Sequence, residues 1–135
     1  MSDGKSSGGC VTLTVCETCR HPDGTRENID GVTGGEMLAR HVSACLEESG
    51  NQAVELRRHA CLMGCDRHCN VGLQAPGKLT YVLGRFEPAR ETAEALVEFA
   101  SLYATSETGQ VPFRQWPQGV KGHFITRVPP LPDGN

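Results

Sequence analysis

Five of the seven cysteines fall in two short segments whose spacing is typical of a metal centre. The first segment reads Cys16-Glu-Thr-Cys19, and the second reads Cys61-Leu-Met-Gly-Cys65-Asp-Arg-His-Cys69. An iron-sulfur cluster or a tetrahedral zinc ion takes four thiolates, and short local spacings let one loop supply two of them. The glycine before Cys65 suits a loop whose backbone turns tightly and directs N–H groups at sulfur. We therefore expect the two segments to share one metal centre.

Five thiols exceed four ligand positions, so one of them is spare. All five are candidate cofactor-binding residues, and the expected metal ligands are Cys16, Cys19, Cys61 and Cys65. Cys69 is the substitute if the short first spacing cannot offer both of its sulfurs to the same metal centre.

The other two cysteines and the neighbouring histidines have simpler interpretations. Cys10 lies beside a flexible segment and is interpreted as a bystander thiol. Cys45 falls on the apolar face of a predicted helix, where a free thiol packs as a small hydrophobe. His59 and His68 lie near the cysteines, and we expect both of them at the surface.

Four arginines flank the cysteine segments and bear on the choice of metal. A 2Fe-2S cluster with four thiolates carries a charge of about −2 when oxidised and one unit more when reduced, so nearby cations favour the reduced state. The flanking cations are Arg20, Arg57, Arg58 and Arg67. Arg67 stands between two cysteines, so it is the hardest of the four to keep away from the centre.

The predicted elements place both cysteine segments at strand ends. Residues 11–16 alternate apolar and polar types up to the first cysteine, and residues 53–59 form a second strand that leads to Cys61. If these strands are neighbours in one sheet, their loops emerge at the same edge and the sulfurs converge. Between them we expect a polar surface loop over residues 20–32 and an amphipathic helix, begun by a capping box, over residues 33–50.

The rest of the chain completes a small α/β domain. Residues 70–74 and 79–83 are predicted to pair as a hairpin around Pro76-Gly77, and helical spacing of apolar residues begins after Pro88. The expected order is β-α-β-β-β-α, in a sandwich with a central mixed sheet. Residues 1–9 are a flexible polar segment, residues 10–105 the domain, and residues 106–135 an irregular C-terminal extension.

Composition narrows the functional classes. A net charge of −3 gives no basic surface for nucleic acid, and no apolar run is long enough to cross a membrane. The N-terminus has no apolar signal region, so we expect a cytoplasmic protein. In such a reducing compartment, seven cysteines indicate metal or redox chemistry. No Ser/His/Asp set, phosphate-binding glycine loop or paired carboxylate stands out, so we expect a metal-binding protein or electron carrier and not an enzyme.

The order of elements and cysteines resembles the thioredoxin-like 2Fe-2S ferredoxins, including the small flavoprotein-associated subunit of respiratory complex I. The resemblance rests on a strand ending at cysteine, a helix, a strand running into Cys61-Leu-Met-Gly-Cys65, the hairpin with Gly77-Lys-Leu-Thr-Tyr81, and a last helix. It implies a thioredoxin-like fold and a 2Fe-2S cluster. Because the related ferredoxins often dimerise, a homodimer is one expected state.

A closer resemblance, over nearly the whole chain, is to a bacterial family of predicted metal-binding proteins. It rests on Val15-Cys-Glu-Thr-Cys-Arg20, the segment from Cys61 to Cys69, Gly77-Lys78, Tyr81-Val-Leu-Gly84 and Arg127-Val-Pro-Pro130. Members of that family are often associated with cobalamin biosynthesis, which implies an electron donor acting around the corrin ring or its cobalt.

Three functions are compatible with these sequence features. The first is electron transfer by a 2Fe-2S cluster between a reductase and an acceptor enzyme. The second is a zinc-binding or metal-handling module that uses the same cysteines. The third is a thiol oxidoreductase using Cys16 and Cys19, and it ranks last because about thirteen residues separate these cysteines from the capping box.

Overall fold

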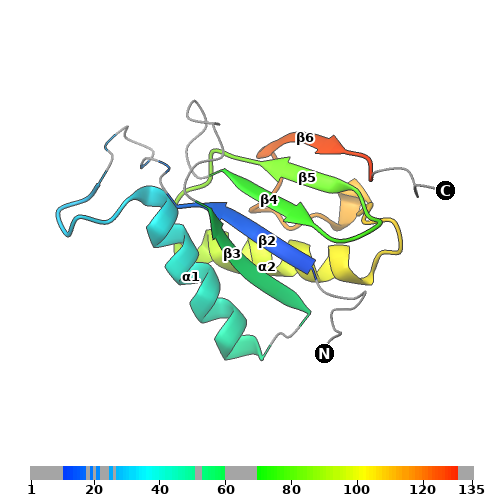
Figure 1. Cartoon of the computed structure of the whole chain (residues 1–135), viewed down its shortest axis with the longest axis horizontal. Coiled ribbons are helices and arrows are strands. Elements are labelled where there is room, and N and C mark those ends of the chain that lie inside the picture. Colours follow the sequence, from blue (N-terminus) through cyan, green and yellow to red (C-terminus); the bar gives the residue numbers. More distant parts are fainter. Residues whose placement is uncertain are drawn as a thin grey trace.

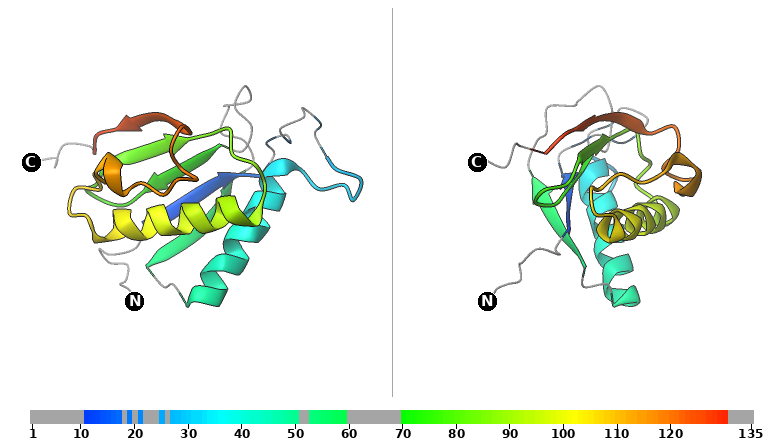
Figure 2. Two further views of the ribbon diagram at one scale, coloured as in Figure 1. Left: turned by 180° about the vertical axis from the view of Figure 1, so that it is seen from behind. Right: turned by 90° about the vertical axis from the view of Figure 1, so that its right-hand side faces the viewer.

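The molecule has two layers, a five-stranded sheet and a pair of helices that cover one face of it (Figures 1 and 2). The helices also pack against each other, which is possible because both lie on the same side of the sheet. The structure is a computed structural model, and it describes residues 11–17, 19, 21, 25, 27–50, 53–59 and 70–130.

Strand β2 (Val11–Cys16) lies inside the sheet, whose order is β3-β2-β4-β5-β6. It runs parallel to β3 (Val54–His59) and antiparallel to β4 (Val71–Gln74). Strand β5 (Thr80–Leu83) continues the hairpin from β4, with Gly77 at φ 75° in the turn. The predicted α/β class, the β-α-β-β-β-α order and the mixed sheet are confirmed.

The core lies between the sheet and the helices. Alternate residues of β2, namely Val11, Leu13 and Val15, are fully buried on the helix-covered face, as the period of two in the sequence predicts. The intervening residues of the strand, which include Thr14 and Cys16, point to the opposite face.

Helix α1 (Gly34–Ser49) confirms the predicted N-terminus and C-terminus of the first helix. The hydroxyl of Thr33 accepts a hydrogen bond from the Glu36 amide at 3.1 Å, and Gly50 closes the helix in the left-handed conformation at φ 65°. These caps are the two that the capping box and the glycine predict. Helix α2 (Arg90–Thr105) begins two residues after Pro88 and buries one apolar face.

The C-terminal extension is more regular than the sequence predicts. After a short 3-10 turn, η1 (Phe113–Gln115), the chain forms strand β6 (Phe124–Val128), which pairs antiparallel with β5 at the edge of the sheet. We predicted no strand there, because a five-residue segment that is exposed along most of its length shows no alternation of apolar and polar types.

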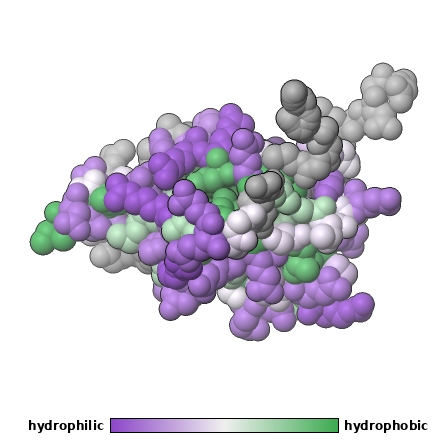
Figure 3. Space-filling model, turned by 90° about the horizontal axis from the view of Figure 1, so that it is seen from below, coloured by the Kyte–Doolittle hydropathy of each residue, from purple (hydrophilic) through white to green (hydrophobic). Residues whose placement is uncertain are grey.

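A loop protrudes at the N-terminal end of α1 (Figure 1). The Asn28 side-chain oxygen accepts hydrogen bonds from the amides of Asp30 and Val32 at 2.9 and 3.0 Å, and an isolated β-bridge joins Glu27 to Thr33. The tip residue Ile29 is 99% exposed, and Figure 3 shows apolar atoms at this tip on a largely polar surface. None of the helices in the described residues is long and apolar enough to cross a membrane.

Candidate metal centre

The residues that flank segment 60–69, His59 and Asn70, are hydrogen-bonded to residues around the first cysteine. Cys16 is the last residue of β2, where it stands in register with His59 of β3. The amide of Glu17 donates to the His59 carbonyl at 2.9 Å, and the amide of Cys16 donates to the Asn70 carbonyl at 3.0 Å. The residues that precede and follow segment 60–69 therefore lie on either side of the end of β2.

The sulfur of Cys19 is buried and accepts two hydrogen bonds from one residue. The backbone amide of Asn70 donates to Cys19 Sγ at 3.3 Å, and the Asn70 side-chain Nδ2 donates to it at 3.6 Å. Cys16 and Cys19 are only 2% and 7% exposed. N–H groups directed at a buried sulfur are typical of thiolates that carry charge or bind metal.

The N-terminus of α1 packs directly on Cys16, Glu17 and Cys19, which we call the cysteine turn. The Gly35 amide donates to the Cys19 carbonyl at 3.0 Å, and the Thr33 hydroxyl donates to the Glu17 carbonyl. A Cβ at Gly35 would lie 1.8 Å from the Cys16 carbonyl oxygen, so only glycine permits this approach. The positive end of the helix dipole therefore faces the cysteine turn.

This contact corrects one premise of the sequence interpretation. We ranked a thiol oxidoreductase last because the helix follows the two cysteines only after a long loop. In the fold, the helix N-terminus reaches Cys19 all the same, through the Gly35 amide. A different observation now counts against the oxidoreductase: both sulfurs are buried, whereas an exchanging thiol has to be accessible to its substrate.

A buried hydroxyl lies on the same face of the sheet as Cys16. Thr14 is 6% exposed, and among the residues that the structure describes its Oγ1 has no hydrogen-bond partner. Because residues two apart in a strand point to the same side, Thr14 and Cys16 share the face away from the helices. A buried hydroxyl is normally satisfied, so this one is available to donate to an acceptor group near Cys16.

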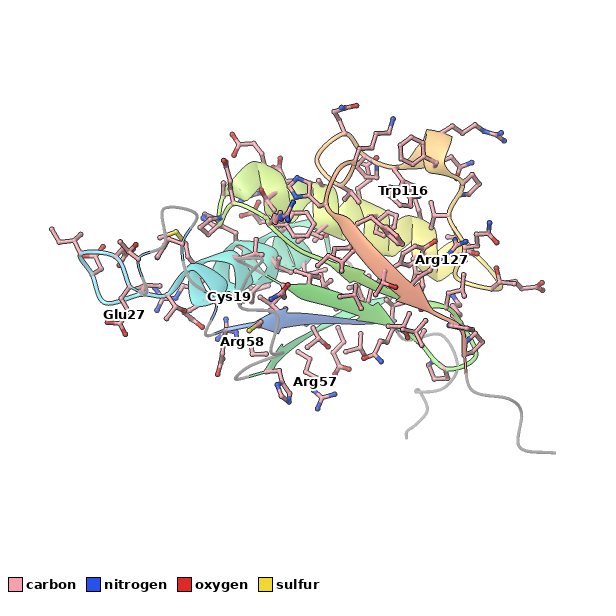
Figure 4. The ribbon with its side chains drawn as sticks, turned by 90° about the horizontal axis from the view of Figure 1, so that it is seen from above. Cys19, Glu27, Arg57, Arg58, Trp116 and Arg127 are labelled. Atoms are coloured by element: carbon pink, nitrogen blue, oxygen red, sulfur yellow. The ribbon has the colours of Figure 1, made fainter. Side chains whose placement is uncertain are left out.

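Two of the four flanking arginines lie within the described residues. In β3, Arg58 is in register with Val15 and its Nη1 is 3.6 Å from Glu36 Oε1, while Arg57 is exposed on the other face of the strand. Figure 4 shows Cys19 and Arg58 near one another, on the side of the molecule toward the Glu27 loop. Positive charge is therefore present beside the cysteine turn, although Glu36 offsets part of it.

Two histidines near the cysteines are not placed as ligands. His59 is exposed, as predicted. His21 follows Cys19 by two residues, and its Nε2 donates to the Val32 carbonyl at 2.8 Å, so this nitrogen is already used.

Cys45 confirms its predicted place in the core. It is 6% exposed on the face of α1 that meets α2, and burial raises the pKa of its thiol. A buried thiol with a raised pKa is a poor nucleophile and a poor metal ligand at neutral pH.

The other predicted site residues lie outside the described residues. These residues are Cys10, Cys61, Cys65, Cys69, His68, Arg20 and Arg67. Within the described part of the chain, no group of three His, Cys, Asp or Glu side chains could hold a metal ion. The structure therefore positions two of the expected thiolates, and the residues that flank the segment with the others.

The chain belongs to the family described as "Protein of unknown function (DUF1636)", which it matches over residues 13–130. That range takes in both cysteine segments and strand β6. No curated protein and no solved structure matches the chain.

Proposed function

We propose that this member of DUF1636 is a small electron-transfer protein that holds a 2Fe-2S cluster. Its expected ligands are Cys16, Cys19, Cys61 and Cys65, with Cys69 as the alternative to one of the first two. When bound, such a cluster accepts and releases one electron at a time. The protein's part is to hold the thiolates, shield them from water and set the charge around them.

One observation carries the proposal: His59 and Asn70, which bracket the second cysteine segment, both bond to the cysteine turn. Cys61 is two residues from His59, and Cys69 is bonded directly to Asn70. The chain therefore enters and leaves segment 60–69 beside the cysteine turn. This entry and exit supports the proposal that thiols from both segments share one metal centre at the end of β2.

The described residues also fit a negatively charged group at this place. The Cys19 sulfur accepts two N–H bonds, and the α1 N-terminus faces the cysteine turn. The buried Thr14 hydroxyl, which has no partner among the described residues, lies on the same face of the sheet as Cys16. The N–H bonds and the helix N-terminus lower the free energy of negative charge on sulfur. Thiolates that hold an iron-sulfur cluster carry such a charge.

The β-α-β-β-β-α order agrees with the proposed relationship to thioredoxin-like ferredoxins. On this view the redox partners are a reductase and an acceptor enzyme, and the reaction served is one of cobalamin biosynthesis. The second candidate function is a zinc or metal-handling module, which the same thiolates would support.

Metal and sulfide analysis of anaerobically purified protein tests the proposal. We expect two iron and two acid-labile sulfide per chain, visible charge-transfer absorption, and an S = 1/2 resonance after reduction. One zinc per chain without sulfide would select the metal-handling module. A chain that stays colourless after reconstitution with iron and sulfide would contradict electron transfer.

Single substitutions then assign the ligands. Cys16→Ser, Cys19→Ser, Cys61→Ser and Cys65→Ser should each lose the cluster or shift its absorption. Cys45→Ala is the matched control, because it removes a buried thiol from the same domain and should keep the full iron content. If Cys69→Ser loses the cluster while Cys16→Ser or Cys19→Ser retains it, then Cys69 is a ligand in place of the dispensable cysteine.

A further inference from the structure

Asn70 directs two hydrogen-bond donors at one sulfur. The residue is 3% exposed and follows the second cysteine segment immediately. Its backbone amide and its side-chain Nδ2 donate to Cys19 Sγ at 3.3 and 3.6 Å, and its carbonyl accepts from the Cys16 amide. Asn70 therefore joins the start of β4 to Cys16 through its backbone and to Cys19 through its backbone and side chain.

The acceptor of the Asn70 side-chain amide, Cys19 Sγ, indicates the charge state of this sulfur. A buried amide that lacks a hydrogen bond destabilises the fold by roughly 1–3 kcal/mol, so its donors are normally matched with strong acceptors such as carbonyl oxygens. A neutral thiol is a weak acceptor, whereas a sulfur that carries negative charge is a much stronger one. Directing an asparagine side chain at Cys19 is thus favourable chiefly when this sulfur is charged.

We propose that the Asn70 side chain is a positioning residue that raises the reduction potential of the centre at Cys19. This inference rests on the proposed 2Fe-2S cluster. One-electron reduction adds one unit of negative charge without making or breaking a bond, and part of that charge resides on the cysteine sulfurs. The Nδ2–H bond to Cys19 stabilises the reduced form more than the oxidised form, so its loss lowers the potential.

The test compares the midpoint potentials of Asn70→Ala and wild-type protein by redox titration monitored in the visible and by EPR. We expect the variant to keep its iron and sulfide, and its reduced-to-oxidised ratio at a fixed potential to fall about tenfold, which is about 59 mV for one electron. Asn70→Gln retains an amide donor and should recover part of the difference. An unchanged potential in a loaded Asn70→Ala variant would overturn the inference.

Asn28→Ala is the matched control. Like Asn70→Ala, it deletes an asparagine side chain. The two hydrogen bonds that the Asn28 side chain accepts lie within the protruding loop. We expect it to lower stability while leaving the potential unchanged. An equal shift in both variants would mean that the potential follows general loosening of the fold, and would overturn a specific role for Asn70.

A second measurement needs no substitution. Wild-type protein carrying ¹⁵N only in the asparagine side chains should show a weak ¹⁵N hyperfine coupling to the reduced cluster in pulsed EPR, through the Nδ2–H bond to Cys19. Absence of that coupling would overturn the inference even if Asn70→Ala failed to fold.

These outcomes separate the inference from the proposed function. A cluster with normal iron and sulfide but no dependence on Asn70 overturns the inference alone. If the wild-type chain takes up Co²⁺ or Zn²⁺ but no sulfide, the proposed electron-transfer function is overturned. In that case, a shift of the sulfur-to-cobalt absorption band in Asn70→Ala would still support a hydrogen bond from Asn70 to a charged sulfur. Binding of neither metal nor cluster overturns both.

Discussion

Two regions of the molecule, one around Cys19 and one around Trp116, bury different kinds of side chain (Figure 4). At the end of β2, backbone amides, a glycine contact and an asparagine hold the turn that carries the buried Cys16 and Cys19. On the β5–β6 side of the sheet, next to α2, aromatic side chains dominate: the Tyr81 ring lies 5.2 to 6.3 Å from four other rings, which belong to Phe99, Tyr103, Trp116 and Phe124. We call these the cysteine end and the aromatic end.

The difference indicates a division of roles. The aromatic end buries large apolar side chains and should supply much of the stability of the domain. The cysteine end buries polar groups whose positions are fixed by hydrogen bonds, which contributes less stability but orients donors toward sulfur. Changes at the aromatic end should therefore alter stability without altering metal binding, and changes at the cysteine end should alter both.

The largest expected effect on stability is that of Tyr81→Ala. The side chain is fully buried at the centre of the aromatic end, and truncating such a residue destabilises a protein by about 3–5 kcal/mol. Urea unfolding of the apo protein measures the loss, and the iron content of the folded fraction should match wild type. Loss of metal from a Tyr81→Ala variant that remains folded would contradict the proposed division of roles.

Gly35→Ala should follow, at about 2–3 kcal/mol, because the new Cβ would overlap the Cys16 carbonyl and force the helix from the cysteine turn. Metal uptake should fall as well. Gly31→Ala is the control: it also replaces a glycine, here at φ 77°, but nothing lies within 4 Å. Its cost should be about 1–2 kcal/mol from backbone strain, with metal uptake unchanged. Equal metal uptake in both variants would remove α1 from the site.

Sequence reasoning predicted the elements well where a regular period marks them. The strand before Cys16, the helix capped at Thr33 and the hairpin around Gly77 all occur within a residue or two of their expected bounds. Local signals suffice there because capping residues and turn glycines act within a few positions of the chain.

The parts that sequence reasoning missed depend on distant contacts. The role of Asn70 arises from a residue 51 positions away, and the role of Gly35 from a carbonyl that the intervening loop brings back to the helix. Strand β6 exists because β5 offers an open edge, and its own residues are mostly exposed. The glycine pair at the start of α1 was a usable signal for close packing, whereas Asn70 carried none.

A smaller effect is expected at the C-terminus of α2. Lys78 Nζ donates to the carbonyls of Tyr103 and Ala104 at 3.1 and 2.9 Å, where the helix dipole is negative. Lys78→Met should lower the free energy of unfolding by about 1–2 kcal/mol, measured in urea. Lys121→Met is the control, because the Lys121 ammonium lies over the Phe113 ring and not at a helix end. Its free energy of unfolding should stay within about 0.5 kcal/mol of that of the wild type. Equal losses in the two variants would show that the carbonyl bonds add nothing.

The smallest effect appears only in alkali. Burial raises the pKa of Tyr103 to about 12 from its usual 10.0. The unfolded chain therefore loses this proton first, so the stabilisation is complete below pH 10 and is lost as pH rises through about 12. Thermal unfolding between pH 9 and 11.5 should decline less steeply in Tyr103→Phe than in wild type. Identical slopes would mean that Tyr103 ionises equally in both states.

The bond between Cys19 and Asn70 has a consequence for the order of assembly. It closes a span of 51 residues, and contacts of such long range form late because a large loop must be ordered first. We expect a newly made chain to complete its sheet before it can present a finished site, so that loading follows folding. Pulsed thiol labelling during refolding should show Cys19 protected no earlier than the amides of β4.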